Sequence, residues 1–333
     1  MSRSSATQAP NRAIELIRTS DRVFLATHVR PDGDALGSLL GLALGLERIG
    51  LTVARLCADP LPAAYAFLPT ADLVTQQPPT WRADLGVVVD CDGLARVGPL
   101  APAFSDLPRL IDIDHHATSQ TFGDVRITEP EAAACAEIVF DLLHALGVAL
   151  DPDIATCLYT GVLTDTGRFC FGNTTARSLT VAAALVRAGA QPSLVARKVY
   201  EDRSIGATHL LGVALSRLSA DFDARVVSAV LTRDDFGATG AVSADTEGII
   251  DHLRAIGGPR VATLFVQMEN GEVRVSLRSD GSVDVSAVAL AFGGGGHAMA
   301  AGCTCPGSVE EVRRKVLAAV RERLPTVAPA DVR

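Results

Sequence analysis

The sequence predicts an α/β protein of two domains: a parallel sheet with helices on both faces, followed by a smaller α/β domain. Short apolar strands alternate with helical segments over residues 12–188, an order typical of a parallel sheet covered on both faces. The 333 residues are enough for two ordinary domains. The alternation stops at residues 189–208, where Gly189, Gln191 and Pro192 break a helix. We therefore expect a connector there and a second domain over residues 209–333.

The first domain is expected to contain four apolar, β-branched strands separated by helices. The strands are Val23–Thr27, Thr52–Leu56, Leu85–Val89 and Leu110–Ile113, and the helices are Ala35–Ile49, Glu131–Leu146, Pro152–Leu163 and Thr174–Ala188. In the first helix Gly37, Gly41 and Gly45 lie four residues apart, so they form one bare stripe. We expect this stripe to pack closely on the sheet. Residues 1–11 are polar and are expected to be a disordered tail.

The second domain mixes strands and helices differently. Asn270-Gly271 is a strong hairpin signal between the expected strands Arg260–Gln267 and Glu272–Leu277. The other expected elements are the strand Arg225–Thr232, the helices Asp245–Ile256, Val285–Ala291 and Val309–Arg323, and the glycine-rich loop Phe292–His297.

Composition excludes several classes of protein. The formal net charge of −8 argues against a protein that grips long nucleic acid through a broad basic surface. No apolar stretch is long enough for a membrane span, and the first residues lack the apolar core of a signal peptide. The seven cysteines are scattered through apolar segments, which is typical of reduced core thiols. These features favour a cytoplasmic protein with no membrane partner.

Carboxylates and imidazoles gather where the expected strands and one helix end. They are His28, Asp32 and Asp34 after the first strand, Asp90 after the third, Asp114, His115 and His116 after the fourth, and Asp165 after an apolar helix. Strand ends are where an open α/β sheet places its chemistry. Such groups are costly to bury together unless cations offset their charge. Oxygen and nitrogen ligands suit a pair of divalent ions such as manganese, which can polarise a phosphoryl group and activate water.

With these motifs the chain resembles the DHH phosphoesterase family, which is named for the triplet Asp114-His115-His116. The second domain resembles the associated DHHA1 domain, through Ser276-Leu277-Arg278-Ser279 and through Gly293–His297 with Ala300-Ala301-Gly302. Within the family, the length and the C-terminal signature resemble the nanoRNases, also described as bifunctional oligoribonucleases and pAp phosphatases. The resemblance implies an active cleft between the two domains.

The resemblance also implies a role for each motif residue. One metal ion would be held by His28, Asp32 and Asp90, and the other by Asp34, Asp90, His115 and Asp165, with Asp90 bridging. The ions would be Mn²⁺, with Mg²⁺ or Co²⁺ as alternatives. His116 would contact the scissile phosphate, so that His116 and Asp90 are the catalytic pair. Asp114 would orient a neighbouring imidazole.

The glycine run before His297 can bring backbone amides close to an anion, and Arg278 can bind phosphate bidentately. The resemblance implies that Arg278, Ser279, Gly295, Gly296 and His297, together with His116, bind the substrate. Two positions depart from the usual family pattern: Ser119, where Asn is frequent, and Cys135, where Ser or Thr is common. Neither is an expected ligand.

The implied activity is hydrolysis of short RNA or DNA oligonucleotides and linear dinucleotides to mononucleotides, and of 3′-phosphoadenosine 5′-phosphate (pAp) to AMP. A homodimer is compatible with the sequence. The alternatives are a RecJ-like exonuclease on single strands and a catalytically inactive nucleotide-binding sensor. A short, acidic chain disfavours the first, and a complete set of expected ligands disfavours the second.

Overall fold

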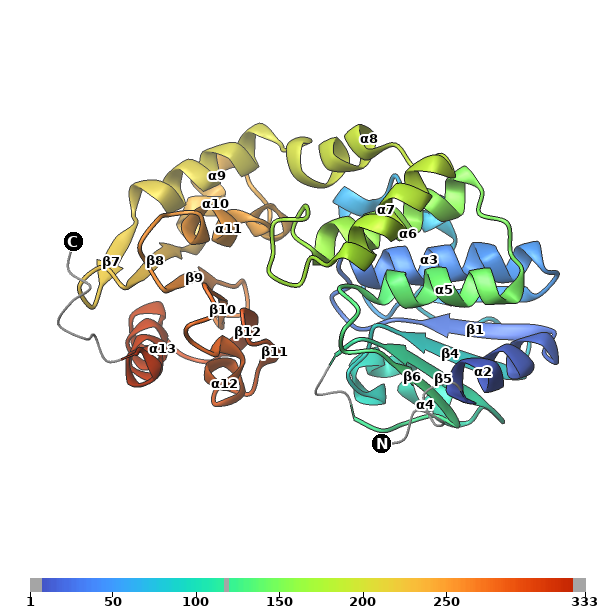
Figure 1. Ribbon diagram of the computed structural model, residues 1–333. Coiled ribbons are helices and arrows are strands. Elements are labelled where there is room, and N and C mark those ends of the chain that lie inside the picture. The colour runs from blue at the N-terminus through green and yellow to red at the C-terminus, as the bar shows by residue number, and fades with distance from the viewer. Residues whose placement is uncertain (1–7, 117–119, 326–333) are drawn as a thin grey trace. The chain divides into compact units, whose positions relative to one another are not determined.

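The computed structural model describes residues 8–116 and 120–325. The chain divides into two units, residues 1–202 and 203–333, and each unit is built around its own six-stranded sheet (Figure 1). The α/β fold class expected from the sequence is therefore confirmed.

The sheet of the first unit is parallel throughout. Its strand order is β3-β2-β1-β4-β5-β6. The strands are β1 (Arg22–Ala26), β2 (Thr52–Leu56), β3 (Val74–Thr75), β4 (Leu85–Val89), β5 (Leu110–Asp114) and β6 (Val125–Thr128). The four strands expected from the sequence form the centre of this sheet, and β3 and β6 were not expected.

Helices cover both faces of this sheet. On one face α3 (Gly33–Arg48) and α5 (Cys135–Leu146) pack on the sheet, and α6 (Pro152–Asp165) and α7 (Ala176–Arg187) pack on these helices (Figure 1). Side chains such as Val23 and Ile111 point toward this helical layer. The other face is covered by the short helices η3 (Leu94–Leu100) and α4 (Ala101–Ser105), which pack on Phe24 and Val88.

The glycine stripe of α3 faces other helices rather than the sheet, so the expected packing partner was wrong. A Cβ on Gly37 would collide with the backbone carbonyl oxygen of Cys157 on α6, and it would lie 2.9 Å from the backbone nitrogen of Gly161. Gly41 would meet Leu158 of α6, and Gly45 would meet Leu143 of α5. The stripe lets two helix backbones approach closely, because Gly161 removes the opposing side chain as well.

Part of the expected N-terminal tail is helical. Helix α2 spans Gln8–Arg18, while residues 1–7 lie outside the described residues. Its buried face includes Ala13, Leu16 and Ile17, and Ala9 packs against the same core one turn earlier. Pro10 does not prevent this extension, because proline is tolerated in the first turn of a helix.

The segment expected as a connector is mostly structured. Helix α8 (Pro192–Ala196) and the π-helix η4 (Arg197–Glu201) belong to the first unit, where Val195 is fully buried. Helix α9 (Ile205–Ser216) belongs to the second unit and begins inside the expected connector. Only residues 202–204 separate η4 from α9.

The second sheet is mixed, with order β11-β12-β10-β9-β8-β7. The strands are β7 (Ser219–Asp221), β8 (Val226–Leu231), β9 (Val261–Gln267), β10 (Val273–Ser279), β11 (Gly295–His297) and β12 (Ala300–Cys305). Among these described strands only β8 and β9 pair in parallel. The β9–β10 hairpin confirms the turn expected at Asn270-Gly271, and Gly271 adopts φ +83°.

Two helical layers enclose this sheet as well. Helices α9, α10 (Arg233–Thr239) and α11 (Ile249–Arg254) cover one face, and α12 (Val285–Leu290) and α13 (Val309–Arg323) cover the other. The helix expected over residues 245–256 is interrupted: the 3₁₀ turn η5 (Ser243–Thr246) precedes Gly248, whose left-handed φ of +73° starts α11 anew. The expected glycine loop is a strand in its last part, since Gly295–His297 pair with Ala300–Gly302.

All seven cysteines are free thiols, and six of them are buried. Among the described residues no single helix is long and apolar enough to cross a membrane. Helix α7 taken together with residues 192–201 meets the length and composition, but the two segments are bent by 110° at their break.

Candidate metal centre

The polar residues expected to form a metal site come together in the first unit, at the carboxyl ends of three adjacent strands. His28 lies two residues beyond β1, Asp90 follows β4, and Asp114 ends β5. Asp165 is the last residue of α6. The fold thus unites positions that lie up to 137 residues apart in the sequence (165 minus 28).

Asp90 is at the centre of this group. One carboxylate oxygen, Oδ2, lies 3.6 Å from Nε2 of His28, and the other, Oδ1, lies 3.5 Å from Nε2 of His115. Oδ1 is also 3.8 Å from Nδ1 of His116. Asp90 has a left-handed φ of +57°, an unusual conformation for a residue other than glycine. Such outliers occur where the surrounding structure fixes a functional side chain.

Three sets of ligand atoms in this unit lie close enough to hold a metal ion. They are His28, Asp32 and Asp90; Asp34, Asp90 and His115; and Asp90, Asp114 and His116, with atoms within 4.8 Å of one another in each set. Asp90 belongs to all three. Asp165 adjoins the second set, because its Oδ2 lies 3.5 Å from Nε2 of His115.

The N-terminus of α5 positions Asp34. The backbone N–H groups of Cys135 and Ala136 donate hydrogen bonds to its two carboxylate oxygens, at 2.6 and 3.0 Å. The hydroxyl of Ser38 donates a third at 3.2 Å. Helix α5 begins four residues later than expected because Ala134 is extended, with φ −154°. That extended residue aims the first free N–H groups of the helix at Asp34.

Asp32 has a structural task as well. One of its oxygens caps helix α3 by accepting the backbone N–H groups of Asp34 and Ala35, at 3.1 and 3.0 Å. Its side chain is exposed, whereas Asp34 and Asp90 are buried. The cap fixes the carboxylate of Asp32, and its second oxygen remains available to a ligand.

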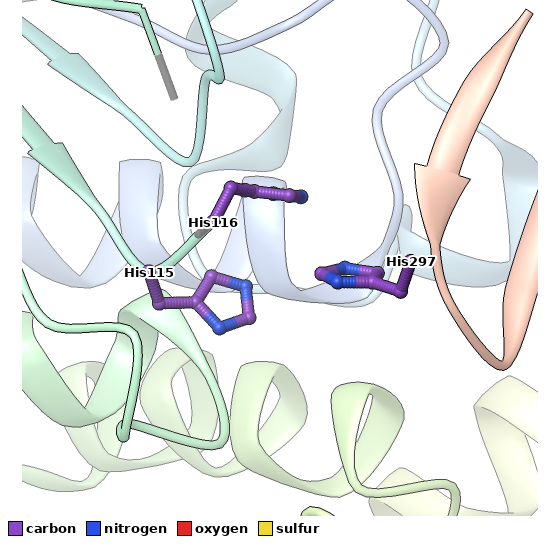
Figure 2. A group of neighbouring side chains, drawn as sticks. All are labelled: His115, His116 and His297. Atoms are coloured by element: carbon purple, nitrogen blue, oxygen red, sulfur yellow. The ribbon is translucent and has the colours of Figure 1, made fainter. Parts of the chain in front are cut away.

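The two histidines of the triplet follow β5 and lie side by side (Figure 2), but their partners differ. Nδ1 of His116 lies 2.7 Å from Oδ1 of Asp114, which also accepts the backbone N–H of His115. Nδ1 of His115 lies 3.1 Å from the carbonyl oxygen of Ala132. Each imidazole is therefore held through Nδ1, and Nε2 of His115 points to the carboxylates of Asp90 and Asp165.

The electrostatics of the centre indicate an excess of negative charge. Burial, together with the charges of Asp90 and Asp165, raises the pKa of Asp34 well above its usual value. Burial also raises the pKa of Asp165, to about 7, although His115 counteracts this effect. Burial alone would lower the pKa of both histidines. The carboxylates outweigh this effect and raise the pKa of His28 to about 9 and that of His115 to about 11.

These shifts fit a cation site. Asp90 retains its charge, because the neighbouring imidazoles of His115 and His28 outweigh its burial and hold its pKa well below the usual value. Its Oδ1 and the Oδ2 of Asp114 are buried and have no hydrogen-bond partner among the described residues. A mixed set of carboxylates and imidazoles is suited to divalent ions such as manganese or magnesium. The residues present therefore fit the metal pair that the sequence predicted.

The residues expected to bind substrate through the second unit lie on two strands that flank β12. Arg278 and Ser279 end β10, and Gly295, Gly296 and His297 form β11, from which His297 projects in Figure 2. Gly296 must be glycine, because it has φ +134° and a Cβ would lie 2.5 Å from the carbonyl oxygen of Ala300. A Cβ on Gly295 would meet no atom within 4 Å.

Arg278 and Ser279 are placed very differently. Ser279 is 2% exposed, and its hydroxyl oxygen accepts the backbone N–H groups of Gly281 and Val283. It thus shapes the turn after β10. Both residues border a cavity of about 70 Å³ that Arg254, Arg260 and Asp280 also line. The side chain of Arg278 is 25% exposed, whereas Ser279 is buried in the turn, so an anion-binding role has more structural support for Arg278.

Sequence reasoning missed some of the residues that arrange these sites. The backbone of Cys135 holds Asp34, and Asp251 of α11 lies 3.5 Å from Arg278. The sequence marks Cys135 only as a departure from the family pattern and gives no signal at Asp251, and each contact joins two different elements. The noted departure at Ser119 lies outside the described residues. Cys135, the other departure, is buried, and its thiol donates to the carbonyl oxygen of Ile113 at 3.3 Å.

Two protein-family models and several relatives match this chain. The family model described as "DHH family, N-terminal domain" matches residues 22–162, and the model of the DHHA1 domain matches residues 223–325. A relative from Thermus thermophilus is 38% identical, over 91% of this chain and 90% of its own length. A relative from Bacillus subtilis is 28% identical, over 87% of this chain and 92% of its own length. Both are named "Bifunctional oligoribonuclease and PAP phosphatase NrnA".

Solved structures agree with the fold. An exopolyphosphatase-related protein from Bacteroides fragilis superposes with a TM-score of 0.88 at 26% identity, over 95% of this chain and 96% of that one. RecJ from Thermus thermophilus, solved in complex with Mn²⁺, has a TM-score of 0.58 at 17% identity, over 96% of this chain and 55% of that one, which supports the fold alone. The chain therefore belongs to the DHH family, as a member with a C-terminal DHHA1 domain.

Proposed function

We propose that the chain is a metal-dependent phosphoesterase that hydrolyses short oligoribonucleotides and linear dinucleotides to mononucleotides, and pAp to AMP. The observation that carries this proposal is the shared position of Asp90, which belongs both to a set with His28 and Asp32 and to a set with Asp34 and His115. A carboxylate common to two ligand sets is what a pair of neighbouring metal ions requires. The names of the relatives at 38% and 28% identity support the choice of substrates.

We assign one ion to His28, Asp32 and Asp90, and the other to Asp34, Asp90, His115 and Asp165. When bound, the ions would polarise the phosphoryl group and lower the pKa of water. Manganese suits this donor set, and magnesium and cobalt are the alternatives. Because the histidines at the centre hold protons in the absence of a cation, binding of the ions should release protons.

His116 is the residue that we propose contacts the phosphate. Its Nδ1 lies 2.7 Å from Oδ1 of Asp114, and we propose that its Nε2 contacts a phosphate oxygen. Asp114 is fully buried, and it fixes both the orientation of the ring and its tautomer. It also raises the pKa of His116, although burial opposes this effect. A protonated His116 would stabilise the negative charge that develops on the phosphate.

The second unit is proposed to bind the rest of the nucleotide. Arg278 offers a guanidinium beside a small cavity with two further arginines, and β11 presents its backbone and His297 from the same unit. A guanidinium fork matches the geometry of phosphate oxygens. Such a grip on a terminal phosphate would favour short nucleotides over long strands.

The test is to assay the purified chain with Mn²⁺ on four substrates in parallel: pAp, a linear dinucleotide, an RNA of a few residues and long single-stranded DNA. We expect mononucleotides from the first three and little product from the fourth. Preferential degradation of the long DNA would favour a RecJ-like exonuclease instead. Binding without hydrolysis of any substrate would favour a nucleotide sensor.

A further inference from the structure

We propose that Asp251 is a positioning residue, which holds the guanidinium of Arg278 in the orientation that binds a substrate phosphate. This inference rests on the proposed function, because it assigns a partner to a residue of the same phosphate grip. Asp251 comes from helix α11 and Arg278 from strand β10, so the contact joins a helix to the sheet beneath it.

Two nitrogens of the guanidinium face oxygens of the protein. Nη1 of Arg278 donates to the carbonyl oxygen of Leu277 at 3.1 Å. Nε faces Oδ1 of Asp251 at 3.5 Å. Both of these facing atoms are buried, and neither has a hydrogen-bond partner within residues 8–116 and 120–325. The two atoms are complementary in charge, so each is the natural partner of the other, and a small closing movement would complete the bond.

The third nitrogen of the guanidinium remains for a ligand. Within the described parts of the chain, Nη2 of Arg278 has no hydrogen-bond partner, and a quarter of the side chain is exposed. A cavity of about 70 Å³ lies beside it, lined in part by Arg254 of the same helix that carries Asp251. Asp251 and Arg254 are three residues apart, and residues at that spacing lie on one side of a helix. Helix α11 thus supplies one residue that holds Arg278 and one that borders its cavity.

The small free energy of such an ion pair indicates that it orients Arg278 rather than stabilising the fold. The side chains of Arg278 and Asp251 are 25% and 35% exposed. An ion pair that is partly exposed contributes only about 0–1 kcal/mol to folding. Fixing a long arginine side chain before the ligand arrives, however, removes an ordering cost that binding would otherwise include. Removal of a residue that orients a functional side chain typically changes affinity or activity by about 10- to 100-fold.

A purely structural role for Asp251 gives a different expectation. Asp251 lies in the first turn of α11, where a carboxylate interacts favourably with the helix dipole. If that were its only task, its loss would destabilise the second unit whether or not Arg278 is present. A positioning role requires instead that the effect on binding disappears when Arg278 is absent.

The experiment compares Asp251→Ala, Asp251→Asn, Arg278→Ala and the double variant Asp251→Ala/Arg278→Ala in the full chain with Mn²⁺. The kinetic constants kcat and KM are measured for pAp and for bis(p-nitrophenyl) phosphate, a simple chromogenic diester with no terminal phosphate. Asp234→Ala is the matched control, because it removes one exposed carboxylate from the same unit, on α10, away from Arg278. Thermal unfolding of every variant shows which of them remain folded.

We expect Asp251→Ala to raise KM for pAp about 10-fold while kcat for the chromogenic diester stays within about twofold. Asp251→Asn keeps an oxygen acceptor, so its KM should lie between those of the wild type and Asp251→Ala. In the Arg278→Ala background, Asp251→Ala should raise KM for pAp by less than about twofold. An unchanged KM in Asp251→Ala, or a full effect of Asp251→Ala without Arg278, overturns the inference.

Failure of this inference is distinguishable from failure of the proposed function. If the wild-type chain does not hydrolyse pAp, a dinucleotide or short RNA, the proposed function is wrong, and the positioning role falls with it. If the wild type is active and Arg278→Ala raises KM but Asp251→Ala does not, only the positioning role is wrong.

Discussion

The backbone N–H of Cys135 donates a 2.6 Å hydrogen bond to Oδ2 of Asp34, although the two residues lie 101 positions apart in the chain. Ala136 donates to the other oxygen of the same carboxylate. The start of helix α5 therefore fixes the carboxylate of Asp34 in place. A helix N-terminus favours the charged form of a carboxylate, which opposes the effect of burial on this residue.

This relationship predicts that Cys135→Pro impairs the metal centre while the helix remains. Proline lacks an N–H and is well tolerated at the first helical position, and the extended Ala134 before it is compatible with proline. We expect the Mn²⁺ concentration for half-maximal activity to rise about 10- to 100-fold. Cys135→Ser keeps the N–H and a side-chain donor, so it should behave like the wild type. Equal metal dependence of the two variants would show that the hydrogen bond from Cys135 to Asp34 does not affect metal binding.

A second prediction concerns the pair of His116 and Asp114, whose atoms Nδ1 and Oδ1 are 2.7 Å apart. Asp114→Asn preserves the shape but removes the charge that favours a protonated His116. We expect kcat for pAp to fall about 10- to 100-fold with little change in KM. Manganese content, measured by elemental analysis, should stay at the wild-type level. A loss of manganese in this variant would mean that Asp114 is a metal ligand and not an orienting residue.

A third prediction tests the close packing of α3 and α6. Gly37→Ala places a methyl group against the backbone of Cys157 and Gly161, which cannot move aside easily. We expect it to lower the free energy of unfolding by about 1–3 kcal/mol. Gly212→Ala in helix α9 is the matched control, because a Cβ there meets no atom within 4 Å. That variant should gain up to about 1 kcal/mol, since alanine is the better helix former. Urea denaturation followed by circular dichroism measures both changes.

A fourth prediction concerns acid stability through Asp235 at the start of α10. Burial would raise the pKa of this carboxyl group, but hydrogen bonds from Thr232 and Arg217 outweigh it and lower the pKa below its usual value. Such a group stabilises the fold above its unfolded pKa of about 4, and this contribution disappears as the pH falls through the lower folded pKa. Asp235→Asn should therefore be less stable than the wild type at pH 7 by about 1–2 kcal/mol. The difference in free energy of unfolding should decrease as the pH falls from 7 through the folded pKa. A difference that stays the same over this range would assign the effect to packing.

The clustering of the proposed metal ligands could be predicted from the sequence because their position follows from a simple rule. His28, Asp90 and Asp114 each end or follow an apolar run, and the carboxyl ends of neighbouring parallel strands meet at one edge. The contact of Asp34 with Cys135, in contrast, depends on the extended conformation of Ala134 alone, and no periodicity indicates it. The same is true of Asp251, whose partner Arg278 lies on another element.

Some elements of the fold could likewise not be predicted from the sequence. Helix α9 is apolar on several sides, so it lacks the alternating pattern that identifies a surface helix. Strand β12 reads Ala300-Ala301-Gly302-Cys303-Thr304-Cys305, mostly small residues with little strand preference. It is a strand because β10 and β11 pair with it on both sides. The partner of the α3 glycine stripe could not be read from the stripe itself, because close approach to a sheet and to a helix require the same small residues.

The central claim is that Asp90 joins two metal ions into one catalytic centre. The most direct measurement is a manganese titration of the wild type and of Asp90→Ala, with bound Mn²⁺ per chain and hydrolysis of pAp followed in the same samples. We predict two ions per wild-type chain, with activity that requires both. Asp90→Ala should remain folded, lose the paired ions and show no hydrolysis above background. Hydrolysis by Asp90→Ala at the wild-type rate, or full wild-type activity with one ion per chain, would contradict the account.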